Sequence, residues 1–165
     1  LAVVWRHGIR TLTLGLALSC LLGGAMLLGG AFTLDGKPQQ DRVDWQPLSE
    51  QAIALALAQN KRVFVDVTAD WCITCKANKF NVLLRDDVQQ ALSAPDVVAL
   101  RGDWSRPSNT IASFLRQRGS VAIPFNQIYG PGLTDGEILS PLLDRSTLLA
   151  TLAQAGIAPS QGEDK

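Results

Sequence analysis

The chain has 165 residues, of which 47% are hydrophobic, and its 15 basic and 15 acidic residues give a formal net charge of zero. No basic patch or run is present, so the composition argues against a nucleic-acid-binding protein. The charge is unevenly distributed: residues 1–33 hold Arg6 and Arg10 and no acid, which leaves 13 basic and 15 acidic residues, a charge of −2, for the rest.

Residues 11–32 contain no charged side chain. As a helix they would be about 33 Å long, enough to cross a hydrocarbon core of about 30 Å. Arg6, His7 and Arg10 precede this segment, so the positive-inside rule predicts that residues 1–33 form a cytoplasmic start and a transmembrane helix. A secretory signal peptide is the alternative, although its apolar core is usually about 7–15 residues.

The N-terminal region also indicates contact with another membrane helix. Gly15, Ser19 and Gly23 recur every four residues, a spacing that lets another membrane helix approach closely, although small residues are common in such helices. Cys20 lies in the same segment and is expected to pack there; electron relay is the alternative. Because the chain begins with Leu1, we expect it to be part of a longer protein.

Beyond this helix, residues 34–44 are polar and predict a linker, residues 45–158 are long enough for one domain, and residues 159–165 form a polar tail. Capping residues, apolar periodicity and turn residues predict a series of helices and strands. In chain order these are a helix at 49–60, a strand at 62–68, helices at 72–84 and 86–93, a strand at 97–101, a helix at 108–118, strands at 124–129 and 137–140, and a helix at 144–156. Strands that alternate with helices predict an α/β domain with a mixed sheet covered on both faces.

The segment Cys72-Ile73-Thr74-Cys75 follows an apolar strand and a short turn, and it opens a predicted helix. Two thiols at this spacing can join in a disulfide that closes a small ring, as in dithiols that exchange electrons with other proteins. A cysteine at a helix N-terminus lies near the positive end of the helix dipole, which favours its thiolate. A structural disulfide or a pair of buried thiols is the alternative.

Metal and haem sites are less consistent with this segment. Zinc would need further ligands, but no second cysteine pair is present and His7 is the only histidine. Covalent haem attachment is disfavoured because Lys76, and not a histidine, follows Cys75.

Residues 68–76, Thr-Ala-Asp-Trp-Cys-Ile-Thr-Cys-Lys, and the later Ile123-Pro124 before a strand resemble the thioredoxin fold. More narrowly, residues 45–157 resemble the C-terminal periplasmic domain of the DsbD/ScsB-type thiol–disulfide interchange proteins, with Gly102–Ser105 and Tyr129–Pro131 adding to the match. The resemblance implies a thioredoxin-like α/β fold, a mixed sheet with helices on both faces, preceded by one transmembrane helix.

The resemblance also implies roles for three residues. Cys72, nearest the exposed end of its helix, would attack a substrate disulfide, and Cys75, one turn inward, would resolve the mixed disulfide. Asp66 lies within an apolar strand, where a carboxylate is costly to bury without a partner or a function. By resemblance it takes the proton from Cys75; a paired structural acid is the alternative. The redox-active disulfide then needs no other cofactor and no metal.

The surroundings of the dithiol follow the same resemblance. Asp70 and Trp71 are expected to shape the surface, with Trp71 also a packing residue, and Lys76 either supports the thiolate or is simply an exposed lysine. Ile123-Pro124 resembles a cis-proline loop, whose free backbone groups pair with a bound peptide; an ordinary trans proline is the alternative. Lys79 departs from the family, whose membrane-linked members often carry an acid there.

These features predict a membrane-tethered protein-disulfide reductase in a bacterial inner membrane, with its catalytic domain in the periplasm. The resemblance implies that electrons come from cytosolic thioredoxin through an upstream membrane domain and pass to periplasmic thiol/disulfide proteins, such as disulfide isomerases or apocytochromes. No histidine lies between the cysteines, which favours a reductant over an oxidant. An anchored thioredoxin for cytochrome c maturation and a non-catalytic Cu(I)-binding module are the alternatives.

Overall fold

The computed structural model describes residues 40–157. The predicted transmembrane helix, Cys20 and the polar tail at 159–165 lie outside the described residues. Between residues 40 and 157, no helix combines the length and the apolar character that a membrane crossing requires.

Within the described residues, five strands form one mixed sheet in the order β1-β3-β2-β4-β5. The central strand β2 (Arg62–Thr68) is parallel to β3 (Val97–Asp103), which in turn is parallel to the short edge strand β1 (Trp45–Pro47). On the other side of β2, β4 (Phe125–Gly130) and then β5 (Leu133–Ile138) are antiparallel. The predicted mixed sheet is confirmed; β1 was not predicted, and β5 starts at Leu133 and not at residue 137.

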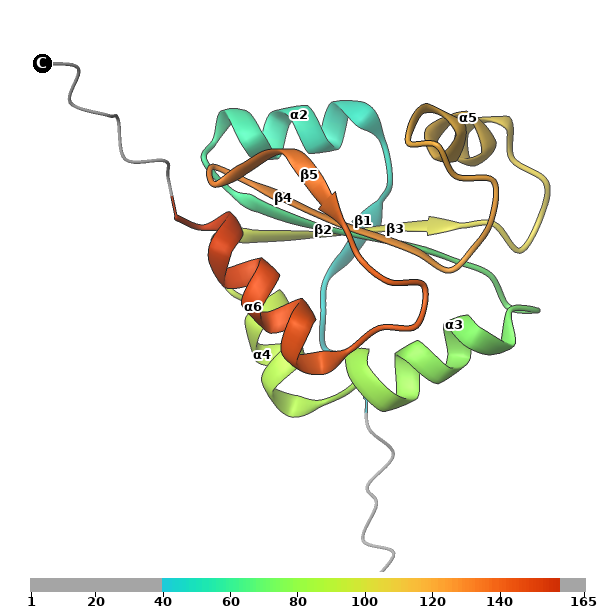
Figure 1. Cartoon of the computed structure of the whole chain (residues 1–165), viewed down its shortest axis with the longest axis horizontal. Coiled ribbons are helices and arrows are strands. Elements are labelled where there is room, and N and C mark those ends of the chain that lie inside the picture. The colour runs from blue at the N-terminus through green and yellow to red at the C-terminus, as the bar shows by residue number, and fades with distance from the viewer. Residues whose placement is uncertain (1–39, 158–165) are drawn as a thin grey trace, which may run out of the picture. The chain divides into compact units, whose positions relative to one another are not determined.

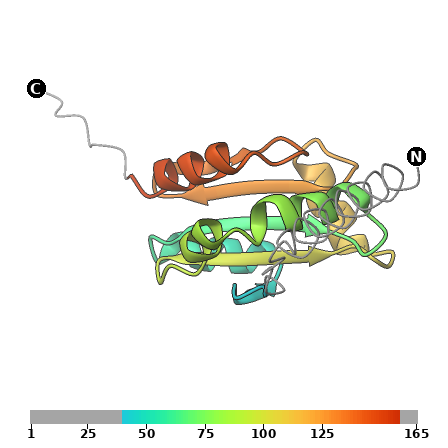
Figure 2. The same cartoon turned by 90° about the horizontal axis from the view of Figure 1, so that it is seen from below.

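Helices cover both faces of the sheet, as predicted. The helical elements are α2 (Glu50–Ala58), α3 (Ile73–Asn78), the π-helical turn η1 (Lys79–Leu83), α4 (Asp86–Leu92), α5 (Asn109–Gln117) and α6 (Arg145–Ala155). The helices α2 and α5 lie over one face, and α3, α4 and α6 lie over the other (Figure 1). Seen from below, α6 runs along β4 (Figure 2).

Two separate hydrophobic clusters fill the space between the sheet and its helices. Side chains alternate along β2, so Val63 and Val65 pack toward α2 and α5, whereas Phe64 packs toward α4 and α6. Because β2 is buried on both faces, its sequence is almost continuously apolar. Asp66 interrupts that run on the face of Phe64, the face that α3 also covers.

The segment before β1 packs against the domain, although its polar composition predicted a linker as far as residue 44. Val43 is buried in the cluster with α4 and α6. The carboxylate of Asp41 accepts hydrogen bonds from Trp45 Nε1 at 2.9 Å and from Gln89 Nε2 at 3.2 Å. Specific side-chain partners, and not composition, therefore hold this segment in place.

The helix that carries the dithiol is not continuous. The predicted helix at 72–84 is divided into α3 and the turn η1, where the backbone accommodates an additional residue. The buried Asn78 ends α3: its Nδ2 donates to Pro141 O at 2.8 Å, and its Oδ1 accepts from Leu143 N at 3.0 Å. This side chain fixes the end of α3 to the connection between β5 and α6.

Candidate active site

Cys72 and Cys75 form a disulfide at the start of α3, with their Cα atoms 5.3 Å apart. Residues 69–71 lead from the end of β2 into α3, for which Cys72 is the N-cap. The Cys72 Sγ accepts a hydrogen bond from the backbone N–H of Cys75 at 3.1 Å. The same N–H is placed to stabilise negative charge on Cys72 Sγ when the disulfide is open.

Both cysteines are largely covered in this oxidised form, each being 6% exposed. Cys72 lies at the N-terminal end of α3, as expected, but its side chain is no more exposed than that of Cys75. The reason is local packing, because the two cysteines form a small cluster with Ala69 and with Ile123 from the loop before β4. An attacking sulfur must therefore approach through the side chains that surround the pair.

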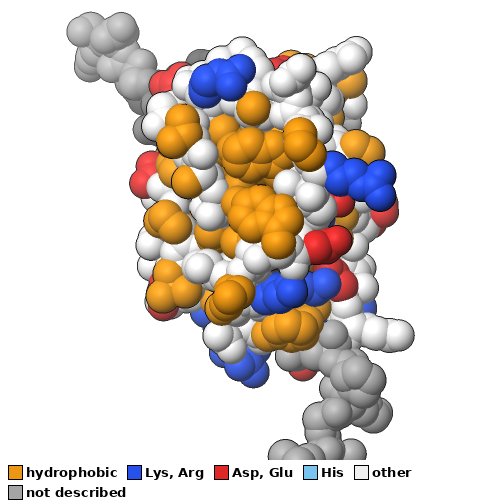
Figure 3. Space-filling model, turned by 90° about the vertical axis from the view of Figure 1, so that its right-hand side faces the viewer, with side chains coloured by type: hydrophobic (Ala, Val, Ile, Leu, Met, Phe, Trp, Pro, Cys, Tyr) orange, Lys and Arg blue, Asp and Glu red, His pale blue; other side chains and the backbone are white. Residues whose placement is uncertain are grey.

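An apolar surface surrounds this end of the molecule. Trp71, Ile73 and Val121 are all exposed, on the segments just before Cys72, just after it and just before the Ile123-Pro124 loop. Figure 3 looks onto this end, where apolar side chains gather at the centre of the face. An apolar patch on a face exposed to solvent is typical of a surface that contacts other proteins.

The peptide bond between Ile123 and Pro124 is cis, as the resemblance implied. Pro124 is buried directly before β4, and Ile123 is half-buried against the dithiol cluster. The structure thus brings Ile123 next to the disulfide, although it is far from it in the sequence.

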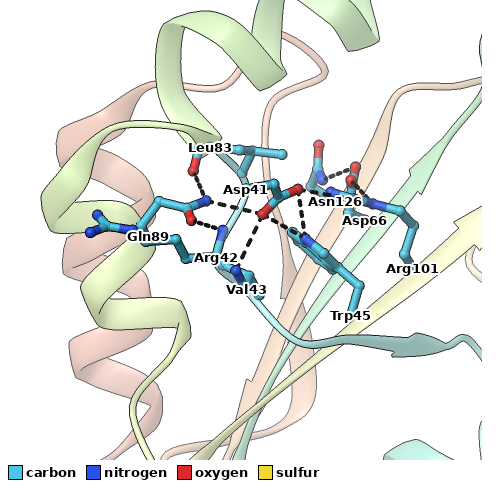
Figure 4. A network of polar contacts seen from close by, with 9 residues as sticks. All are labelled: Asp41, Arg42, Val43, Trp45, Asp66, Leu83, Gln89, Arg101 and Asn126. Atoms are coloured by element: carbon cyan, nitrogen blue, oxygen red, sulfur yellow. Dashed lines mark hydrogen bonds and ion pairs between the residues drawn. The ribbon is translucent and has the colours of Figure 1, made fainter. Parts of the chain in front are cut away.

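Asp66 is placed by strand register. It is opposite Arg101 of β3 and Asn126 of β4, so the three side chains lie side by side across the sheet. Arg101 Nε donates to Asp66 Oδ2 at 3.0 Å, and Asn126 Nδ2 donates to Asp66 Oδ1 at 3.1 Å (Figure 4). A carboxyl group that is only 5% exposed therefore has a donor on each oxygen.

A cavity of about 350 Å³ joins Asp66 to the dithiol. It is lined by Asp66, Thr68, Ala69, Asp70, Cys75, Lys76, Lys79, Phe80, Arg101 and Asp103. Asp66, Asp70, Cys75 and Lys76 were expected at the site, and the structure brings them together around this one space. Cys72, Trp71, Ile123 and Pro124 do not line it.

Burial raises the pKa of Asp66 above that of an ordinary aspartate, and Arg101 and Asn126 only partly oppose the effect. The cause is the removal of the carboxylate from water. A carboxyl group with a raised pKa is a stronger base than an exposed aspartate, so it accepts a proton from a neighbouring group more readily.

A second cleft, of about 340 Å³, lies beside the exposed Trp71. It is lined by Trp71, Trp104, Ala112 and the residues 105–109 between them in the fold. The backbone N–H of Asp70 donates to Ser105 Oγ at 2.9 Å, which ties the turn before Cys72 to the loop after β3. Hydrogen bonds from Ser105 also hold the pKa of Asp103 below its usual value.

Three contributors to this site were not predicted from the sequence: Asp41, Arg101 and Asn126. One signal was available for Arg101, because it is a charged residue within the apolar run of 97–102, just as Asp66 is in its own strand. Two opposite charges in neighbouring buried strands are expected to pair. Asn126 and Asp41 had no such signal, since amides and acids are common at strand starts and in linkers.

A thioredoxin-like family model matches residues 44–131. The thiol:disulfide interchange protein DsbD of Pseudoalteromonas atlantica is 27% identical over 130 residues, which are 74% of this chain and 22% of that protein. DsbD of Yersinia pestis is 30% identical over 123 residues, 70% of this chain and 20% of that protein. The chain thus spans about a fifth of the length of these curated relatives.

Solved structures show the same fold. The C-terminal domain of DsbD from Neisseria meningitidis in its reduced form superposes with a TM-score of 0.51 and 24% identity, covering 64% of this chain and 91% of that one. A thioredoxin from Thermus thermophilus superposes with a TM-score of 0.52 and 23% identity, covering 68% of this chain and 85% of that one.

Proposed function

Because this chain belongs to the thioredoxin-like family and is distantly related to the C-terminal domain of DsbD, we propose that it is a protein-disulfide reductase that acts through Cys72 and Cys75. The observation that supports this most is the Cys72–Cys75 disulfide next to a cavity that also contains a buried carboxyl group, Asp66. A structural disulfide would need no titratable group beside it.

The reaction consists of two exchanges. In the reduced protein, the Cys72 thiolate attacks one sulfur of a substrate disulfide; that S–S bond breaks, and the other substrate sulfur leaves as a thiolate. The Cys75 thiol then gives its proton to Asp66, and its thiolate attacks Cys72 Sγ. This step forms the Cys72–Cys75 bond and releases the second substrate sulfur. The substrate gains two electrons and the dithiol loses two.

Recognition of the substrate is assigned to the apolar surface around the pair. Trp71 and Ile123 offer contact area on either side of the disulfide, and Pro124 supports the loop that bears Ile123. Asp70 and Lys76 border the cavity, where their charges act on the proton transfer. Because the cysteines are largely covered, a partner that fits this surface brings a sulfur to Cys72 more readily than one that does not.

The relatives support a proposal for the electron source and for the location. DsbD is named a thiol:disulfide interchange protein, and this chain matches its C-terminal part. We assign the domain to the periplasmic side of a bacterial inner membrane, tethered by residues 1–33, where an upstream membrane domain reduces it. Its substrates are then periplasmic thiol/disulfide proteins.

The test uses the full chain in a Cys20→Ser background, so that only Cys72 and Cys75 react. With Cys75→Ser and glutathione disulfide, we expect one glutathione adduct per chain, detected by mass and removed by dithiothreitol. The matched Cys72→Ser, Cys75→Ser double variant should form none. Absence of any adduct from the Cys75→Ser chain would remove the assigned roles.

The direction of exchange is tested by equilibrating the Cys72–Cys75 pair with glutathione. A reductant should have a potential near that of thioredoxin, about −270 mV, whereas a strong oxidant lies near about −120 mV. A value at the oxidising end would contradict the proposed direction but not thiol exchange itself. Stoichiometric Cu(I) in the purified chain, together with no exchange at all, would instead support a metal-binding module.

A further inference from the structure

Arg101 lies at the centre of the polar network beside the dithiol cavity. Its Nε donates to Asp66 Oδ2 at 3.0 Å, and its Nη1 is 3.4 Å from Asp41 Oδ2. The guanidinium carbon is 3.6 Å from the centre of the Trp45 ring, a cation–π contact. One side chain therefore joins the carboxyl group of β2 to the segment around β1 (Figure 4).

The far end of this network is itself held in place. Asp41 accepts hydrogen bonds from Trp45 Nε1 at 2.9 Å and from Gln89 Nε2 at 3.2 Å. Burial raises the pKa of Asp41, but these hydrogen bonds and the charge of Arg101 outweigh it, and the pKa lies below the usual value. Asp41 therefore stays negative at neutral pH and keeps the guanidinium at a fixed point.

We propose that Arg101 is a positioning residue for the exchange reaction: it fixes the carboxyl group of Asp66 beside Cys75 and favours its ionised, proton-accepting form. The inference rests on the proposed proton transfer from Cys75 to Asp66. Arg101 acts through Asp66 and contacts neither sulfur directly. Asp41 and Trp45 serve to hold Arg101.

The ion pair differs from the surface pairs of the same domain. The side chains of Arg101 and Asp66 are 23% and 8% exposed, whereas those of the Arg62–Asp96 pair are 18% and 54% exposed. Exposed pairs contribute little, but a buried carboxylate that loses its partner becomes strongly disfavoured and takes up a proton. Removing Arg101 therefore acts on the protonation of Asp66, and not on stability alone.

Other charged groups also face this space. Lys76 from α3, Lys79 from η1, Asp70 from the turn before Cys72 and Asp103 at the end of β3 border the cavity. Among the described residues, only Arg101 of the cations is hydrogen-bonded to Asp66.

Asn126 gives independent support. Its Nδ2 donates to Asp66 Oδ1 at 3.1 Å, while its own Oδ1 is buried and has no hydrogen-bond partner among residues 40–157. Figure 4 shows this oxygen on the side of the amide away from the carboxyl group. A buried amide with an unsatisfied acceptor is unfavourable for folding, and the hydrogen bond that its Nδ2 donates to Asp66 offsets part of that cost.

The test follows the reaction of the reduced full chain, in the Cys20→Ser background, with the aromatic disulfide dithiobis(nitrobenzoate). Attack by Cys72 releases the first coloured thiolate, and attack by Cys75 on the mixed disulfide releases the second. Arg101→Gln should move the pH profile of the second phase upward by about one unit, which is about tenfold in rate below the midpoint, and leave the first phase unchanged.

Two further variants keep the test decisive if Arg101→Gln does not fold. Arg101→Lys keeps the positive charge but loses the planar guanidinium group and its fixed donor geometry. We therefore expect a smaller shift of the second-phase pH profile in the same direction. Asn126→Leu removes a donor from Asp66 together with the unsatisfied acceptor, and it should also shift the pH profile of the second phase upward. Arg62→Gln is the matched control, since it breaks an arginine–aspartate pair at the start of β2 and should leave both profiles unchanged.

The outcomes separate this inference from the proposed function. If the parent chain releases no second thiolate, the exchange mechanism itself fails. The parent chain can instead release both thiolates while the variants Arg101→Lys, Asn126→Leu and any folded Arg101→Gln show the same second-phase pH profile as the parent. In that case only the role of Arg101 is overturned. A shift of equal size in Arg62→Gln would likewise overturn it, because the effect would then be one of general stability.

Discussion

Asp66 is held between two opposing effects. Removal from water favours the neutral carboxylic acid, whereas the guanidinium of Arg101 and the amide of Asn126 favour the carboxylate. Burial is the larger effect, so the pKa of Asp66 remains above its ordinary value. The residue is therefore suited to receive a proton from a neighbouring thiol, a use that an ordinary aspartate, ionised and weakly basic, serves poorly.

The same balance predicts how stability depends on pH. The pKa of Asp66 is higher in the folded than in the unfolded chain, so at pH values between the two the folded chain binds more protons. The free energy of unfolding therefore decreases as the pH rises from the unfolded-state pKa to the folded-state pKa. Asp66→Asn has no such proton. The free energy of unfolding of Asp66→Asn minus that of the parent chain should therefore increase with pH from about 4 upward.

Urea unfolding at a series of pH values measures this difference. A constant offset between the two chains only reflects altered hydrogen bonds, so the slope is the informative quantity. A difference that stays flat or falls with pH would show that the charged form of Asp66 is not penalised by folding.

At the scale of elements, the position of the dithiol depends on how α3 ends. The π-helical turn η1 leaves Phe80 exposed and turns Val82 and Leu83 into the core. Asn78 holds this junction through its bonds to Pro141 O and Leu143 N, two backbone groups of the β5–α6 connection. The buried side of α3 is therefore attached to a segment that is distant in sequence.

Asn78→Ala should lower the free energy of unfolding by about 2–4 kcal/mol, because it removes both bonds and leaves the part-buried carbonyl of Pro141 and the buried N–H of Leu143 without partners. Denaturant unfolding measures the loss. Asn81→Ala is the matched control: it changes the same residue type on η1 at an exposed position and should stay within about 0.5 kcal/mol. Equal effects of the two substitutions would contradict the anchoring role of Asn78.

At the scale of the whole molecule, α6 must lie very close to the sheet. A Cβ atom at Gly130, the last residue of β4, would overlap the backbone carbonyl of Ala155 in α6. The N–H of Gly132 also donates to Ala155 O at 2.9 Å, so the turn between β4 and β5 is bonded to the end of that helix. The helix cannot be displaced without loss of this contact.

Gly130→Ala should therefore destabilise the domain by about 1–3 kcal/mol through overpacking, because backbone and not a flexible side chain opposes the added methyl group. The measurement is the midpoint of urea unfolding, compared between chains whose unfolding free energy depends equally steeply on the urea concentration. Gly156→Ala, at the end of the same helix, meets only the flexible Arg62 side chain and ordinary contacts, so it should change stability by less than about 0.5 kcal/mol. A neutral Gly130→Ala would mean that α6 can shift freely on β4.

Much of the local structure is apparent from the chain alone, because the signals lie within a few residues of each other. Ser49 caps α2 by accepting from Ala52 N, and the apolar run at 62–68 forms the central strand. The dithiol opens α3 and the Ile123-Pro124 bond is cis, both as the motifs implied. The three-residue strand β1 escaped prediction because it has no apolar alternation and forms only by pairing with β3.

Spacing between the cysteines, helix caps and the pattern of apolar residues were readable without coordinates, since each depends on neighbours along the backbone. Packing of distant segments decided the remainder: the contact of Ile123 with the cluster that contains both cysteines, and the row of interacting side chains from Asp41 through Arg101 and Asp66 to Asn126. Arg101 and Asn126 are 35 and 60 residues from Asp66 in sequence, and only the register of three strands brings them to the same carboxyl group.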